Sequence, residues 1–231
     1  MLGVLLASTV LAASLYGSEA PFAGKPFQKW TLQEALEILT QSPWSRQETF
    51  TQVVGGVGSG ISGEKEIYNT FFIRFLSAQP VREALARVRQ IQTGYDRLDR
   101  AGKKNMDSTL EPGLQLDVHR WIVLTLGFRS NDSAVEMRVR QALEAQTTQT
   151  MKSRAFLSTT HFQQIEIAAY FPPEEDIVGA RFVFARRIVG IPVVFPEDDS
   201  VIFELDVPGF DRALRIKFDV PQMLLKGEPV L

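Results

Sequence analysis

Residues 64–98, EKEIYNTFFIRFLSAQPVREALARVRQIQTGYDRL, carry the two patterns that decide the fold. From residue 66 to residue 76, apolar side chains occupy both faces of an extended chain, which indicates a central strand covered on both sides. After Pro80, apolar residues recur every three or four positions, the period of an amphipathic helix. They are Val81, Leu85, Val88, Ile91, Tyr95 and Leu98. This stretch predicts a buried strand that leads into one long helix.

Arg74 is the exceptional residue of the predicted strand, because it places a cation among three phenylalanines. One interpretation is structural: the arginine snorkels at the sheet edge or pairs with a carboxylate such as Glu34 or Asp117. The other is functional: the guanidinium binds an anion in a pocket. Arg74 is therefore a candidate binding residue, and its partners decide between the two.

The outer face of the predicted helix is rich in arginine, diluted by acidic residues, and this mixture is typical of a solvated face. The arginines are Arg82, Arg87, Arg89, Arg97 and Arg100. Gly102 is expected to end the helix as its C-cap, followed by a polar loop over residues 102–115.

Upstream, Thr31 and Glu34 form a capping-box pattern at the start of a helix that should stop before Pro43. Residues 54–63 are Gly-rich and predict a flexible surface loop. They contain a literal G-x-G-x-x-G over 58–63, but the glycines precede a strand. A dinucleotide site requires the opposite order.

Downstream, the patterns predict a second buried strand over 117–126, a helix over 133–150, and then strands joined by short turns. The predicted strands lie at 155–158, 164–171, 182–188, 201–207 and 214–220. Consecutive strands with short connections indicate antiparallel pairing. We predict an α+β fold in which about three helices pack against an antiparallel or mixed sheet of about six or seven strands. Residues 30–231 would form a single globular domain.

Asp117 and His119 are two residues apart on the predicted strand, so they would point to the same face and could poise a general base. They join Arg74 as candidate binding residues. His161 is the only other histidine, and the two histidines lack the spacing of a usual zinc site. We predict no metal, no cofactor and no catalytic set.

Composition limits the class of protein. The net charge of −2 shows no basic field for nucleic acid, and the absence of cysteine excludes disulfides and thiolate chemistry. Residues 1–20 combine a short apolar run with small residues and predict a signal peptide, followed by a linker over 21–29. We expect an exported protein, periplasmic or extracellular, with no transmembrane span in the mature chain.

Three segments carry a resemblance: WTLQEALEILTQSPW before the Gly-rich insert, FFIRFLSAQPVREAL, and the ending IKFDVPQMLLKGEPVL. They resemble a group of uncharacterised exported bacterial proteins whose N-terminal helix ends in Ser-Pro-Trp. The resemblance implies export and a common fold, and no activity. The leading hypothesis is a non-catalytic structural or interaction module of the cell envelope, whose partner would be another envelope protein. A carrier of a hydrophobic ligand and an envelope hydrolase are the alternatives.

Overall fold

The predicted central strand is β2, which lies inside an antiparallel sheet in the computed structural model of the protein. β1 pairs with one edge of β2 and β3 with the other, and β7 and β6 extend the sheet to the order β1-β2-β3-β7-β6. The bounds are β1 (Ser45–Gly55), β2 (Glu64–Phe75), β3 (Trp121–Ser130), β6 (Ala169–Phe171) and β7 (Ala180–Ala185). The structure describes residues 25–55, 64–174 and 178–231.

A second antiparallel sheet has the order β11-β10-β4-β5. Its strands are β4 (Ala155–Ser158), β5 (Ile165–Glu166), β10 (Ser200–Asp206) and β11 (Ala213–Asp219). Two small ribbons complete the β structure: β8 (Arg187–Ile188) with β9 (Ile191–Pro192), and β12 (Leu224–Leu225) with β13 (Glu228–Pro229).

The main core lies between the two sheets. The register places Phe75 opposite Leu124, and Leu124 opposite Phe182, so one face of the first sheet is a continuous apolar surface. The ring of Phe75 packs edge-on against Phe218 of β11, with the ring centroids 4.7 Å apart. Phe182 packs in the same way against Phe203 of β10, with the centroids 5.4 Å apart. Aromatic burial of this kind stabilises a fold by about 1.5–3 kcal/mol per side chain. One contiguous apolar cluster joins both sheets and the helices.

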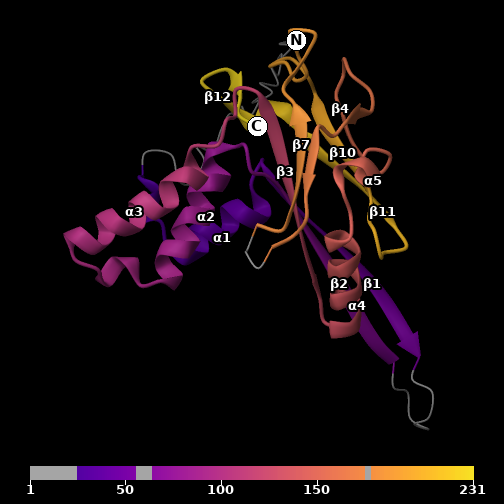
Figure 1. Ribbon diagram of the computed structural model, residues 1–231, viewed down its shortest axis with the longest axis horizontal. Coiled ribbons are helices and arrows are strands. Elements are labelled where there is room, and N and C mark those ends of the chain that lie inside the picture. Colours follow the sequence, from indigo (N-terminus) through magenta and orange to yellow (C-terminus); the bar gives the residue numbers. More distant parts are fainter. Residues whose placement is uncertain (1–24, 56–63, 175–177) are drawn as a thin grey trace, which may run out of the picture.

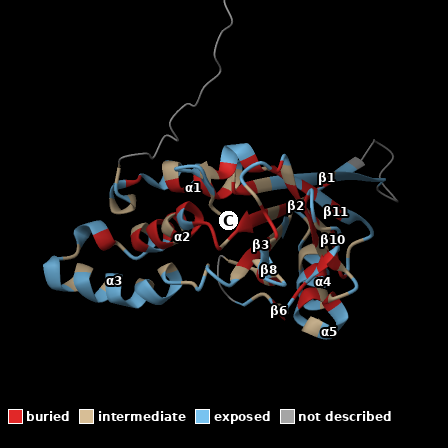
Figure 2. Cartoon of the chain, turned by 90° about the horizontal axis from the view of Figure 1, so that it is seen from above, coloured by how far each residue is buried: buried red, intermediate tan, exposed pale blue. Residues whose placement is uncertain are grey.

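Three helices, α1, α2 and α3, lie on the face of the first sheet that is turned away from the second sheet. Figure 1 shows α1, α2 and α3 on one side of β3 and β7, with β10 and β11 on the other side. α2 is heavily buried and α3 is largely exposed (Figure 2). The helices are α1 (Leu32–Gln41), α2 (Gln79–Gln92), α3 (Arg100–Leu114), α4 (Ser133–Glu144) and α5 (Thr148–Met151).

The prediction of one long helix over 80–102 was wrong. The chain leaves α2 at Gln92, turns at Gly94 with φ +75° and passes through the 3-10 turn η2 (Tyr95–Arg97). The side chain of Asp99 then accepts a hydrogen bond from the Gly102 amide at 2.8 Å and caps α3. Gly102 therefore lies in the first turn of a helix, and the predicted loop over 102–115 is mostly helical. No residue of α3 is buried, and its sequence contains Gly102, Pro112 and Gly113, which are typical of loops.

The α+β class and the antiparallel pairing are as predicted, but the counts differ. The described residues contain five α-helices and thirteen strands in four sheets rather than three helices on one sheet. β1 was missed because most of its side chains are polar and exposed. The strand predicted over 164–171 breaks into β5 and β6, which join different sheets.

Several element ends also differ from prediction. The strand predicted from residue 117 begins at Trp121, and the helix predicted over 133–150 ends at Glu144 with Asp132 as its cap. A 3-10 turn, η1 (Phe27–Lys29), lies within the predicted linker. The signal peptide over 1–20 and residues 56–63 of the Gly-rich loop lie outside the described residues. Among the described helices, none is long and apolar enough to cross a bilayer.

Candidate functional site

A groove of about 1050 Å³ lies where α1, α2 and α3 meet the first sheet and α4. Leucines and arginines dominate its lining. The leucines are Leu36, Leu76, Leu85, Leu110, Leu114, Leu116, Leu126 and Leu143. Among the described residues of the lining, six arginines face two glutamates, so these eight side chains carry a formal charge of +4. The arginines are Arg74, Arg82, Arg89, Arg129, Arg140 and Arg181, and the glutamates are Glu136 and Glu174.

Arg74 lies deep in this groove with only 9% of its surface exposed. Its Nε donates a hydrogen bond to the Leu39 carbonyl at 2.7 Å, and its guanidinium lies 5.3 Å from the centre of the Phe72 ring. Burial lowers the pKa of Arg74 to about 10, which leaves it protonated at neutral pH. The side chain is thus fixed at one end while its two Nη groups remain available.

The predicted carboxylate partners of Arg74 were wrong. Glu34 instead accepts two hydrogen bonds from Lys25 at 2.9 and 2.8 Å, and Asp117 lies in an exposed loop. Within the described part of the chain, no carboxylate forms an ion pair with Arg74. A buried cation without a carboxylate is costly unless another anion or polar group compensates it.

Gly127 of β3 keeps the groove open beside this guanidinium. A Cβ added there would lie 3.8 Å from Arg74 Nη1 and 3.6 Å from Phe72 Cβ, which is ordinary van der Waals contact. The glycine is therefore not required by the backbone, but its missing side chain exposes Nη1 to the groove.

Arg82 and Arg87 were predicted to lie on a solvated helix face, and both are buried. Arg82 donates from Nε to the Leu114 carbonyl at 3.0 Å and from Nη1 to Leu76 at 3.3 Å and to Ser77. Burial lowers its pKa. These bonds fix the ends of β2 and α3 to α2, so Arg82 is committed to the scaffold.

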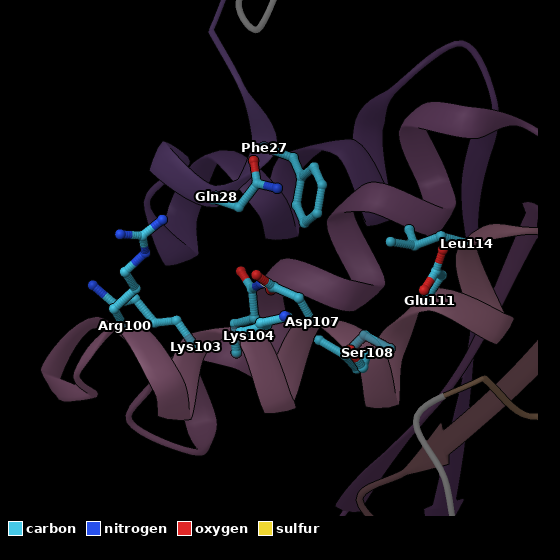
Figure 3. A pocket seen from close by; sticks show the side chains of 11 residues that line it. Phe27, Gln28, Arg100, Lys103, Lys104, Asp107, Ser108, Glu111 and Leu114 are labelled. Carbon is cyan, nitrogen blue, oxygen red and sulfur yellow. The ribbon is translucent and has the colours of Figure 1, made fainter.

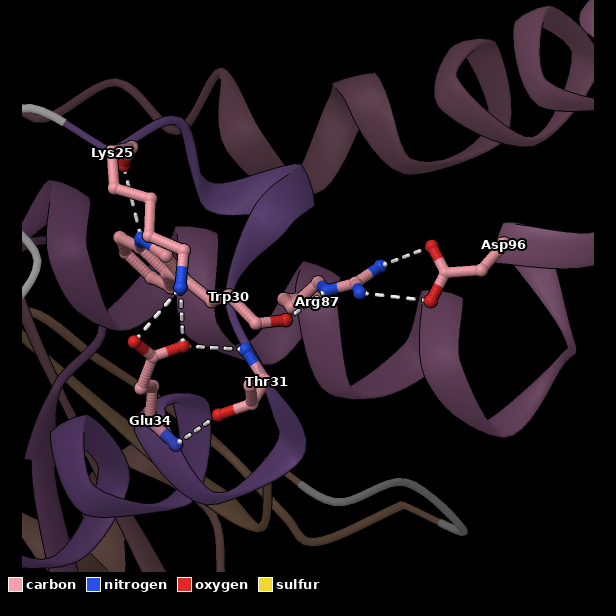
Figure 4. Close-up of polar contacts among 6 residues, drawn as sticks. All are labelled: Lys25, Trp30, Thr31, Glu34, Arg87 and Asp96. Carbon is pink, nitrogen blue, oxygen red and sulfur yellow. Dashed lines mark hydrogen bonds and ion pairs between the residues drawn. The ribbon is translucent and has the colours of Figure 1, made fainter.

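Arg87 is equally committed (Figure 4). Its Nε donates to the Trp30 carbonyl at 2.6 Å, and its two Nη groups form a forked pair with Asp96 at 3.0 and 2.9 Å. The pair lowers the pKa of the Asp96 carboxyl. Arg87 thereby joins the segment before α1 to the turn after α2.

The outer arginines of the groove differ in their partners. Arg129 pairs with Glu136 at 2.8 Å, Arg140 with Glu144 at 2.8 Å, and Arg181 with Glu174 at 3.4 Å. Arg89 is exposed at the rim and has no polar partner among the described residues. Sequence reasoning singled out Arg74 but missed the groove, because its lining comes from helices and strands far apart in the chain.

Asp117 and His119 do not join Arg74. Both precede β3, Asp117 in a loop and His119 in a turn, and both are exposed and outside the groove lining. Their predicted alternation on one strand face was wrong because the strand begins two residues later, at Trp121. A binding role for either residue stays a prediction without geometric support.

His161 has a buried acidic partner. Its Nε2 lies 3.3 Å from Oδ1 of Asp198, whose other oxygen accepts a hydrogen bond from the Phe195 amide at 2.8 Å. No hydroxyl within the described ranges hydrogen-bonds to the imidazole. Ser158 and Thr159 accept bonds from backbone amides of the same loop. The same ranges hold no cluster of three His, Asp or Glu side chains suited to a metal ion.

A smaller hollow of about 690 Å³ lies between η1, α2 and α3. Figure 3 shows Phe27 and Gln28 of η1 opposite Asp107 of α3. Asp107 accepts hydrogen bonds from Gln90 at 3.0 Å and from the Tyr95 hydroxyl at 2.9 Å. These contacts attach α3 to α2, and we assign the hollow a packing role.

No protein-family model, curated protein or solved structure matches this chain. We therefore infer a function from the geometry of the chain itself.

Proposed function

We propose that the protein is a non-catalytic binding protein of the bacterial cell envelope and that the groove around Arg74 is its ligand site. Export is supported by the apolar N-terminal run and by the resemblance to exported bacterial proteins. The observation that carries the binding role is Arg74: a nearly buried guanidinium that faces a groove and has no carboxylate partner among the described residues.

The groove favours a small ligand over a protein partner. Its volume of about 1050 Å³ lies near the upper end of typical small-molecule sites, about 300–1,000 Å³. Its apolar wall, formed by eight leucines, is also typical of such sites, and its charged side chains can orient a ligand. The carrier alternative is thereby favoured over a purely structural module. The hydrolase alternative would depend on His119 or His161. His119 is exposed and outside the groove lining, and no hydroxyl of the described residues hydrogen-bonds to the His161 imidazole.

The site can be tested with two tryptophan substitutions on α1. Leu36 and Leu32 are exposed to 43% and 42%, and only Leu36 lines the groove. We expect 1-anilinonaphthalene-8-sulfonate, an anionic aromatic probe, to bind the wild type with a stoichiometry near unity in calorimetry. Leu36→Trp should weaken this binding about tenfold by filling the groove, and Leu32→Trp should leave it unchanged. Equal effects of both substitutions, or no saturable binding, would refute the site.

Export is tested separately by fractionating native cells and sequencing the N-terminus of the protein. A mature N-terminus just after residue 20 is expected in the envelope fraction. Cytoplasmic protein that retains Met1 would contradict the proposal.

A further inference from the structure

We infer that the ligand of the groove is a long-chain fatty acid, whose carboxylate binds Arg74 and whose hydrocarbon chain lies along the leucines. This inference rests on the proposed binding function and names the ligand class. It follows from three features of the groove: one uncommitted buried cation, long apolar walls and the distribution of charge.

The first feature is the state of the Arg74 guanidinium. An arginine has five N–H donors, and among the described residues Arg74 uses only Nε, in the bond to the Leu39 carbonyl. The bond to Leu39 and the Phe72 ring hold the guanidinium in place before any ligand arrives. A carboxylate matches the planar guanidinium fork through two parallel N–H···O bonds, and such charge-assisted pairs are about twice as strong as neutral hydrogen bonds.

The second feature is that Arg74 is the single buried cation of the described groove lining that is available to bind an anionic headgroup. Arg82 is equally buried, but its Nε and Nη1 already bind three backbone carbonyls. Arg129, Arg140 and Arg181 each have a glutamate partner. A ligand with a single anionic group therefore fits this groove better than a polyanion, because Arg74 is the one interior cation of the described lining that has free N–H groups and no carboxylate partner there.

The third feature is the apolar remainder of the wall. Eight leucines line the same groove, and they come from α1, α2, α3, α4, β3, the turn after β2 and the loop after α3. Burial of a hydrocarbon chain contributes about 0.8 kcal/mol per CH₂, so the chain would supply most of the affinity. The rim arginines add a net positive field that attracts an anion toward the opening.

The test uses displacement of a dansyl-labelled undecanoic acid from the full-length mature protein. We expect laurate to displace the probe and dodecanol to do so at least about tenfold less well, because the alcohol lacks the charge that Arg74 would bind. Acetate, which has the charge and no chain, should not displace the probe. Equal displacement by laurate and dodecanol, or displacement by acetate, would overturn the inference.

Three variants locate the carboxylate. Arg74→Lys keeps a cation that can reach the Leu39 carbonyl but loses the fork, and should weaken laurate about tenfold at an unchanged melting temperature. Gly127→Ala, which the backbone accommodates, places a methyl beside Nη1 and should also weaken laurate. Arg97→Met removes one charge from an exposed position outside the groove lining and is the matched control, with less than about a twofold effect.

A loss at Arg97→Met as large as at Arg74→Lys would overturn the inference, since binding would then depend only on the overall charge of the protein. The proposed binding function is tested separately, by binding of the anionic aromatic probe. If the anionic aromatic probe binds and is blocked by Leu36→Trp while laurate fails, the binding function stands and the fatty acid is wrong.

Discussion

At the scale of single residues, burial of an arginine does not by itself define a site. Arg74, Arg82 and Arg87 are all nearly buried, yet each has a different set of partners. Arg82 binds backbone carbonyls, Arg87 binds a carbonyl and a carboxylate, and Arg74 leaves its Nη groups to the groove. The difference lies in what surrounds each guanidinium, which the spacing of arginines along a helix or strand does not reveal.

Glu34 gives a residue-scale prediction for the dependence of stability on pH. Hydrogen bonds from Lys25 and from the backbone amide of Thr31 lower the pKa of its carboxyl from 4.5 to about 2 (Figure 4). A lowered folded-state pKa contributes stability that is present above the unfolded pKa and is lost as pH falls. We expect Glu34→Gln to melt at a lower temperature than the wild type at neutral pH, with the gap closing between pH 4.5 and about 2.

Glu37→Gln is the control for this prediction. Glu37 is exposed on the same helix and has no polar partner among the described residues. Its effect on the melting temperature should not vary over the same pH range. A gap for Glu34→Gln that widens toward acid would contradict the proposed role of the Lys25 ion pair.

At the scale of elements, the sequence predicted those segments whose local signals and core contacts agree. β2 was predicted because both its faces are apolar, and α1 because Thr31 and Glu34 form a capping box, which the structure contains. α3 was missed because none of its residues is buried, and β1 because its side chains are mostly polar. The groove could not be predicted, since it requires the tertiary placement of α1, α2 and α3 on the sheet.

Gly179 gives a prediction for the start of β7, where the chain approaches β3 most closely. Its φ is +85°, and an added Cβ would lie 2.3 Å from the Leu126 carbonyl oxygen. Gly179→Ala should therefore cost about 3 kcal/mol or more in unfolding free energy, through left-handed strain and a backbone clash.

Gly190, in the turn between β8 and β9, provides a matched control for the Gly179 substitution. Its φ of +81° is nearly the same, but an added Cβ meets nothing within 4 Å. Gly190→Ala should cost only the strain, about 1–2 kcal/mol in urea denaturation. Equal losses at the two glycines would show that the close approach to β3 does not limit the fold.

At the scale of the whole molecule, the helices and both sheets share one apolar cluster, from Trp30 and Trp44 to Phe218. The groove lies on the opposite side of the first sheet from the aromatic core, and β2 contributes to both. Phe75 faces the second sheet, whereas Arg74 faces the helices. A single strand thereby couples the stability of the core to the position of the candidate binding residue.

Phe203 tests whether this cluster unfolds as one unit. Its ring is fully buried and packs against Phe182 at 5.4 Å and Phe184 at 6.3 Å, joining the two sheets. Phe203→Ala should destabilise the protein by about 3–5 kcal/mol through the cavity it leaves. Because the cluster is continuous, tryptophan fluorescence and far-UV circular dichroism should shift to the same lower urea midpoint.

Phe171→Ala is the control for this prediction. The Phe171 side chain is 51% exposed, so the substitution should change the urea midpoint little. A fluorescence transition in Phe203→Ala that is separate from the circular dichroism transition would show that the cluster does not unfold as one unit.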